Sequence, residues 1–121
     1  MLLVVGEHVL EDLSSECARM ATGFAGGVGD TQQEMCGALS GGVLVIGGLL
    51  GRIELRESDR PTLDLATRYR RHFLIKFGDT QCAKLREKVV YAPGGLGSCA
   101  TLVEQAATIL LELFAEAAEA T

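Results

Sequence analysis

The sequence predicts an all-α fold, a single-domain bundle of about five helices around a glycine-rich, buried central helix. Along most of the chain, apolar residues recur at intervals of three and four, the period of an amphipathic helix. Strand signals are weak, because aromatic residues make up 5% of the chain and β-branched runs are short, as at Val43–Ile46. With 121 residues, 48% of them hydrophobic, the chain suffices for one domain with its own core, spanning residues 1–121.

The first helix is predicted over residues 4–22. Val5, Val9, Leu13 and Cys17 recur every four residues and form an apolar stripe beside a row of acidic residues. The helix leads into residues 23–29, a glycine-dense connection that cannot continue it.

The second helix, predicted over residues 31–50, is the expected central element. Asp30 with Gln33 and Thr31 with Glu34 both have the spacing of a capping box, which predicts a start at Asp30 or Thr31. Beyond this start the helix is apolar nearly all round, as in a buried helix. Three of its glycines share one side, at Gly37, Gly41 and Gly48. An interior glycine lowers helix stability by about 1 kcal/mol, so these glycines predict close approach of a second backbone or a bulky cofactor.

Three more helices follow a charged connection over residues 52–60. Pro61 suits a first turn, Gly78 a helix end, and the apolar residues between them repeat every four positions, which predicts a helix over 61–77. A short helix is predicted over residues 81–88, capped by Asp79 or Thr80. Ser98 is the expected cap of the last helix, over residues 99–118.

Charge and hydropathy exclude two classes of function. The net charge is −5, with −5 in residues 1–51, +4 in 52–88 and −4 in 89–121. Such a chain lacks the continuous positive surface that nucleic acid binding needs. The uncharged residues 35–51 are short for a membrane span and contain six glycines, so a buried helix is favoured. We therefore expect a cytoplasmic protein, with a homodimer if the apolar second helix is not fully covered.

Four cysteines carry the most chemical information: Cys17, Cys36, Cys82 and Cys99. In the cytoplasm, cysteines are more often metal ligands or redox groups than structural disulfides. Three of them fall near predicted helix starts, where free N–H groups favour thiolates and lower the pKa. No C-x-x-C spacing occurs, so zinc ribbons and thioredoxin-like pairs are excluded. From spacing alone, burial of the cysteines as small core residues is an equal alternative.

The segment Cys36-Gly37-Ala38-Leu39-Ser40-Gly41 carries a family resemblance. With Cys17-Ala18 and a glycine-rich turn before it, and Cys82 and Cys99 after it, the pattern resembles the C_GCAxxG_C_C family of redox-active proteins. That family is similar to the iron–sulfur part of the split-Soret cytochromes c. The resemblance implies that the four cysteines are the functional residues and that an iron–sulfur cluster is the cofactor. It implies a class of function and not a reaction, so whether the chain is an enzyme stays open.

Three hypotheses follow. In the first, the four thiolates bind an iron–sulfur cluster, of the [2Fe–2S] type, and exchange electrons with a redox partner protein that the sequence does not identify. Gly37 and Gly41 would then let the cluster or a neighbouring helix approach, and exposure to air could remove the cluster. In the second, the cysteines form disulfides reversibly without metal. In the third, the chain is a non-catalytic helical interaction module whose cysteines pack in the core.

Overall fold

The computed structural model describes residues 1–119, and every regular element in them is helical. The prediction of an all-α fold is therefore confirmed. An isolated bridge between Met35 and Gln81 is the one strand-like pairing within this range. The α-helices are α1 (Glu7–Val9), α2 (Ser15–Met20), α3 (Gly37–Leu50), α4 (Arg60–Phe77), α5 (Cys82–Leu85) and α6 (Cys99–Glu119), with π turns η1 (Leu2–Gly6) and η3 (Arg86–Val90) and the 3₁₀ turn η2 (Thr22–Phe24).

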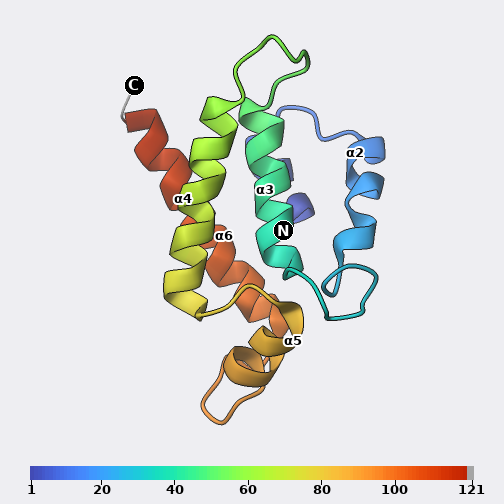
Figure 1. The fold of residues 1–121 in the computed structure, drawn as a ribbon, viewed down its shortest axis with the longest axis vertical. Coiled ribbons are helices and arrows are strands. Elements are labelled where there is room, and N and C mark those ends of the chain that lie inside the picture. Colours follow the sequence, from blue (N-terminus) through green and yellow to red (C-terminus); the bar gives the residue numbers. More distant parts are fainter. Residues whose placement is uncertain (120–121) are drawn as a thin grey trace.

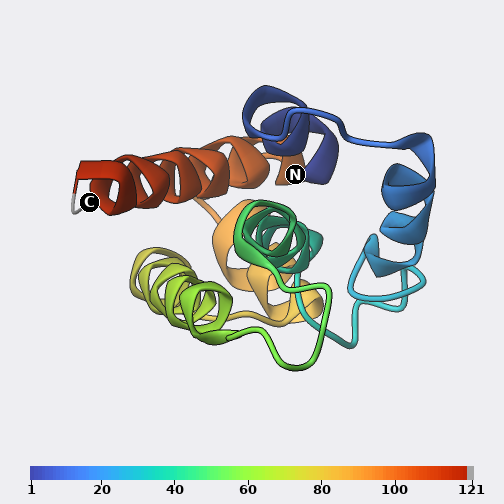
Figure 2. The same ribbon diagram turned by 90° about the horizontal axis from the view of Figure 1, so that it is seen from above.

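The core lies where α3, α4 and α6 pack against one another, with η1 covering another side of α3 (Figures 1 and 2). The predicted four-residue stripe of α4 is confirmed, since Leu65, Tyr69, Phe73 and Phe77 are all buried. Tyr69 donates a hydrogen bond of 2.8 Å to the backbone oxygen of Ala38, which satisfies the one polar atom on this stripe.

The prediction of one continuous helix over residues 4–22 is wrong. The N-terminal turns end at Val9, and Leu10 has extended backbone angles of −92° and 135°. A new helix, α2, starts at Ser15 because the Ser14 hydroxyl accepts a hydrogen bond from the Cys17 N–H. None of the residues of α2 is buried, and α2 lies apart from α3, α4 and α6 in both views (Figures 1 and 2).

The predicted start of the second helix is also wrong, because α3 begins at Gly37 with Cys36 as its N-cap residue. Asp30 has a φ of 57°, in the left-handed region, so it does not open a helix. The Thr31 hydroxyl donates to the backbone oxygens of residues 27 and 28, both at 2.9 Å, instead of capping a helix. Instead of the expected capping box, this segment forms a loop with local hydrogen bonds from Thr31 back to residues 27 and 28.

The later elements follow the predictions closely. The helix α4 ends at Gly78, whose φ of 82° is the left-handed conformation expected of a glycine cap. The predicted short helix appears as α5 continued by η3. The helix α6 begins at Cys99, and the Ser98 hydroxyl accepts the N–H of Thr101 at 3.2 Å, as expected of a cap. In residues 1–119 no helix is long and apolar enough to cross a membrane.

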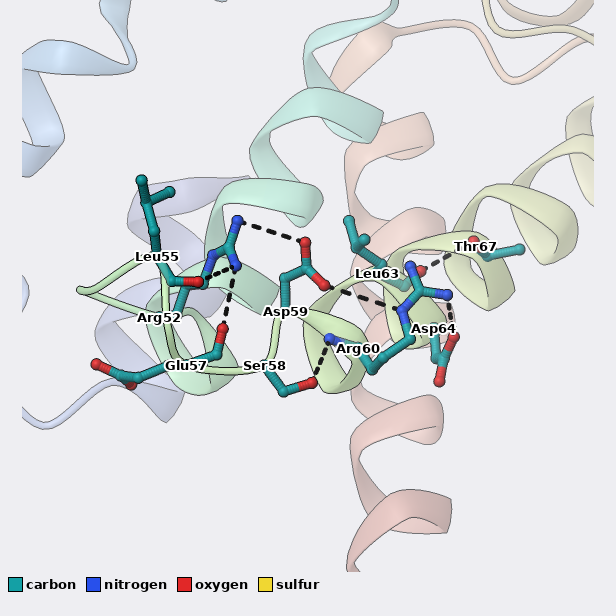
Figure 3. Close-up of polar contacts among 9 residues, drawn as sticks. All are labelled: Arg52, Leu55, Glu57, Ser58, Asp59, Arg60, Leu63, Asp64 and Thr67. Atoms are coloured by element: carbon teal, nitrogen blue, oxygen red, sulfur yellow. Dashed lines mark hydrogen bonds and ion pairs between the residues drawn. The ribbon is translucent and has the colours of Figure 1, made fainter.

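The charged connection between α3 and α4 is held by Arg52 (Figure 3). Its Nη1 donates hydrogen bonds of 3.0 Å to the backbone oxygens of both Leu55 and Glu57, and its Nη2 lies 3.5 Å from Asp59. One side chain therefore orders the turn, which lies at the end of α3 opposite Cys36.

Candidate functional site

Backbone pairing brings two of the four cysteines together. The Cys36 N–H donates to the oxygen of Thr80 at 2.7 Å, and the Cys82 N–H donates to the oxygen of Glu34 at 2.9 Å. The bridge between Met35 and Gln81 lies between these two bonds. Two cysteine-bearing segments, 46 positions apart in the chain, are thus fixed side by side by main-chain hydrogen bonds.

A third cysteine joins them around one cavity. Cys36, Cys82 and Cys99 all line a cavity of about 550 Å³, which we call the thiol cavity. Cys36 comes from the start of α3, Cys82 from the start of α5 and Cys99 from the start of α6. The cavity is also lined by Met1, Leu2, Leu3, Val4, Ala18, Ala21, Thr22, Phe24, Ala25, Gly26, Gly37, Ala38, Gly41, Leu44, Leu85, Arg86, Val90, Leu102 and Val103. Most of these side chains are apolar, so the thiols face a weakly polar space.

Cys17 lies outside this group. Its side chain is exposed and lines a second cavity, of about 810 Å³. The two cavities share wall residues, including Ala21 and Phe24, and Ala18 next to Cys17 lines the thiol cavity itself. The structure therefore brings together three of the four predicted cysteines and leaves the fourth at the rim.

The glycines of the expected site have different roles. A Cβ added at Gly41 would lie 2.7 Å from the Cβ of Met1, so this glycine admits the N-terminal segment. At Gly37 the nearest atom would be the oxygen of Phe24, at 3.7 Å, an ordinary contact. Gly37 and Gly41 do line the thiol cavity. The tight approach at Gly41, however, is that of the Met1 side chain, with the Leu2 backbone N at 3.4 Å.

Gly27 is a site residue that the sequence reasoning did not single out. It has a φ of 69°, and a Cβ there would lie 2.7 Å from the Cβ of Cys82. Only glycine meets both demands, so this position lets the loop pack directly on a cysteine. The glycine-dense run 23–29 in the sequence predicted a turn. It did not predict that the turn packs against Cys82.

Comparison with known proteins identifies the family of this chain. Residues 1–113 match the family described as "Putative redox-active protein (C_GCAxxG_C_C)". The chain belongs to this family. It has no significant match among curated proteins or among solved structures. The description of the family consists of a pattern of cysteines and glycines.

Burial determines the acidity of two thiols of the C_GCAxxG_C_C protein. It raises the pKa of Cys36, although the N–H groups of Ala38 and Leu39 at the start of α3 oppose the rise. It also raises the pKa of Cys82, against the attraction of the Arg86 guanidinium. The expectation of lowered thiol pKa values at helix starts is wrong for these two cysteines, because desolvation outweighs the N–H groups at Cys36 and the Arg86 charge at Cys82.

Arg86 is the second site residue that the sequence reasoning did not identify. Its guanidinium lies beside Cys99 and Cys82, whose negative charge raises the Arg86 pKa. Its Nε is buried and has no hydrogen-bond partner within the described part of the chain. A buried N–H donor without an acceptor is unfavourable, so this atom marks a place where an acceptor fits.

The thiols of the C_GCAxxG_C_C protein are unbridged and, among the described residues, are not grouped as in a metal site. All four cysteines are unbridged, and residues 1–119 contain no group of three or more His, Cys, Asp or Glu side chains spaced to hold a metal ion. The three cavity thiols therefore surround a space instead of meeting at one point. Any bound centre would fill that space and draw the sulfurs toward it.

Proposed function

We propose that this chain is an electron-transfer protein in which Cys36, Cys82 and Cys99 bind an iron–sulfur cluster, of the [2Fe–2S] type, with Cys17 as the fourth ligand. The observation that carries the proposal is the thiol cavity, in which cysteines from three separate helices surround one space. Four cysteinates are the usual ligand set of such a cluster. Membership of a redox-active family supports the same class of function.

The residues of the cavity suit an anionic sulfur centre. A cluster with four thiolates carries net negative charge, and the Arg86 guanidinium with its unpartnered Nε lies in the cavity wall. The N–H groups of Ala38 and Leu39 point to the Cys36 sulfur and add positive potential there. Both features favour negative charge inside a cavity whose other walls are apolar.

Cys17 belongs to the part of the structure best suited to move. The helix α2 has no buried residue and contacts little besides the neighbouring turn η2. An element with few buried contacts opens and shifts at low free-energy cost. Cluster binding would draw Cys17 from the rim toward the cavity that Ala18 already lines.

Each part of the chain has a distinct role in this proposal. The cluster, when bound, accepts and releases one electron. Gly27 lets its loop pack behind Cys82 and so fixes that thiol. Leu102 and Val103 line the cavity from α6 and exclude water, which strengthens the interaction between the thiolates and the Arg86 charge.

A metal-free dithiol protein is a second candidate, favoured by the absence of a grouped metal site among the described residues. No three of them are grouped as in a metal site within residues 1–119. In this alternative, two cavity thiols release two electrons and two protons to an oxidised partner dithiol and form a disulfide. The same cysteines serve both candidates, so metal content decides between them.

The test is anaerobic reconstitution with iron and sulfide, followed by visible absorption spectra and iron analysis. Wild type is compared with the single variants C17S, C36S, C82S and C99S, and with A100S as a control at the exposed neighbour of Cys99. We expect A100S to bind iron like wild type, the three cavity variants to lose the bound iron, and C17S to bind it more weakly. Far-ultraviolet circular dichroism checks that each variant is folded.

Two results would contradict the proposal. If wild type stays colourless and iron-free but forms a disulfide reversibly, the dithiol candidate is correct. If it does neither, the cysteines are packing residues of an interaction module. The expected homodimer is checked on the same samples by light scattering after gel filtration.

A further inference from the structure

Arg86 differs from the arginines that form ion pairs. Arg52, Arg56, Arg60 and Arg68 each lie within 4.0 Å of a carboxylate. None of the ion pairs in residues 1–119 involves Arg86, although it is only partly exposed and its Nε is fully buried. A buried guanidinium atom without an acceptor requires compensation, which the protein's carboxylates do not supply.

The Arg86 side chain lies in the same cavity wall as the thiols. Cys82 and Arg86 are four residues apart across α5 and the start of η3, a spacing that puts two side chains on one helix face. Both residues line the thiol cavity, and Cys99 lies beside the guanidinium. The acceptor that the structure offers to Arg86 is therefore sulfur.

We infer that Arg86 is a positioning residue that stabilises the reduced, more negative form of the redox centre by donating its guanidinium N–H groups to sulfur. This inference rests on the proposed function. A reduced iron–sulfur cluster carries one more negative charge than the oxidised cluster, so a fixed cation in the wall favours reduction and raises the potential. A thiolate carries a negative charge that a disulfide lacks, so the direction is the same for a metal-free dithiol.

Substitution at one position separates charge from shape. R86Q keeps a planar donor group but removes the charge, and R86K keeps the charge but loses the planar fork. R71Q is the matched control, because Arg71 is an exposed arginine of α4 that does not line the cavity. The three variants and wild type are reconstituted anaerobically, and their midpoint potentials are measured by spectroelectrochemical titration.

We expect R86Q to lower the equilibrium constant for reduction about tenfold, which is about 59 mV for a one-electron couple. We expect the midpoint potential of R86K to fall by no more than half as much as that of R86Q. We expect R71Q to have the midpoint potential of wild type. Loss of stability alone would change the iron content and the thermal midpoint, but not the potential of the fraction that binds a cluster. Equal potentials in wild type and R86Q, or equal shifts in R86Q and R71Q, would overturn the inference.

The inference can fail separately from the proposed function. If wild type binds no iron, the same four proteins are equilibrated with oxidised and reduced dithiothreitol. In that exchange, two cavity thiols pass two electrons and two protons to oxidised dithiothreitol and form a disulfide. If the disulfide is harder to reduce in R86Q than in R71Q, the role inferred for Arg86 is supported although the proposed iron–sulfur cluster is refuted. Equal equilibrium constants, or no exchange at all, overturn the inference as well.

Discussion

Substitution of Gly42 tests the packing that holds α3 against α4. A Cβ added at Gly42 would lie 2.7 Å from both Cζ and Oη of Tyr69 and would also clash with its Cε2. Tyr69 is 0% exposed and its hydroxyl donates to the oxygen of Ala38, so the ring has no free space to enter. The matched control is Gly47 in the same helix, where an added Cβ would meet no atom within 4 Å.

The magnitude follows from three opposing effects. Overpacking a core costs about 1–3 kcal/mol. Displacing the Tyr69 hydroxyl from Ala38 adds about 1 kcal/mol. Replacing a helical glycine with alanine returns about 1 kcal/mol. We therefore expect G42A to lower the free energy of unfolding by about 1–3 kcal/mol and G47A to raise it by up to about 1 kcal/mol.

Urea denaturation followed by circular dichroism measures both variants. A second pair, Y69F and the double variant G42A/Y69F, removes the hydroxyl and with it one of the three clashing atoms. G42A should then be less destabilising in the Y69F background than in wild type. If G42A were as stable as G47A, the close contact between α3 and Tyr69 would not exist in solution.

Three further predictions concern the segments around the thiols. The Asp79 carboxylate accepts two backbone N–H groups that hold its pKa below the ordinary value of 3.8. The stability that the ionised Asp79 contributes is therefore complete above about pH 4 and is lost as the pH falls through the lowered pKa. Over that pH range, the urea midpoint should fall less in D79N than in wild type. In the metal-free protein, iodoacetamide should modify the exposed Cys17 before Cys36, whose thiol is partly buried and has a raised pKa; mass spectrometry showing equal rates would contradict the described burial. G27A should lower stability and iron retention more than G29A, because both positions have a positive φ but only the first would clash with a cysteine; equal losses in the two would mean that backbone strain alone acts.

The sequence could predict those elements whose signals are local. Helix α4 has its apolar stripe, its proline start and its glycine end within eighteen residues, and the structure confirms all three. The last helix begins at Cys99 behind the predicted Ser98 cap for the same reason. Here the period of the side chains and the cap residues agree, and no distant segment competes with them.

The failed prediction of the start of the second helix depends on a distant segment. The spacing of Thr31 and Glu34 is correct for a capping box, but the oxygen of Glu34 accepts the N–H of Cys82 instead. With this pairing, residues 31–36 form no helix, so α3 starts at Gly37 and Cys36 is its N-cap residue. A local sequence pattern at Glu34 cannot predict a hydrogen bond to Cys82, which lies 48 residues away in the chain.

The candidate site is predictable in the same uneven way. The sequence pattern predicts four functional cysteines and the family to which the chain belongs, and the family match confirms the family. It does not reveal that burial outweighs the helix N–H groups at Cys36, or that Arg86 lacks a carboxylate partner in the described residues. Both properties arise from the tertiary fold, because desolvation depends on which side chains cover a group.

The central claim is that the thiol cavity holds an iron–sulfur cluster. The most direct measurement is the amount of iron and of acid-labile sulfide per chain after anaerobic expression with added iron, without any reconstitution step. We expect iron and sulfide in equal amounts, up to two of each per chain for a [2Fe–2S] cluster. Protein that contains neither, or iron without sulfide, would contradict it.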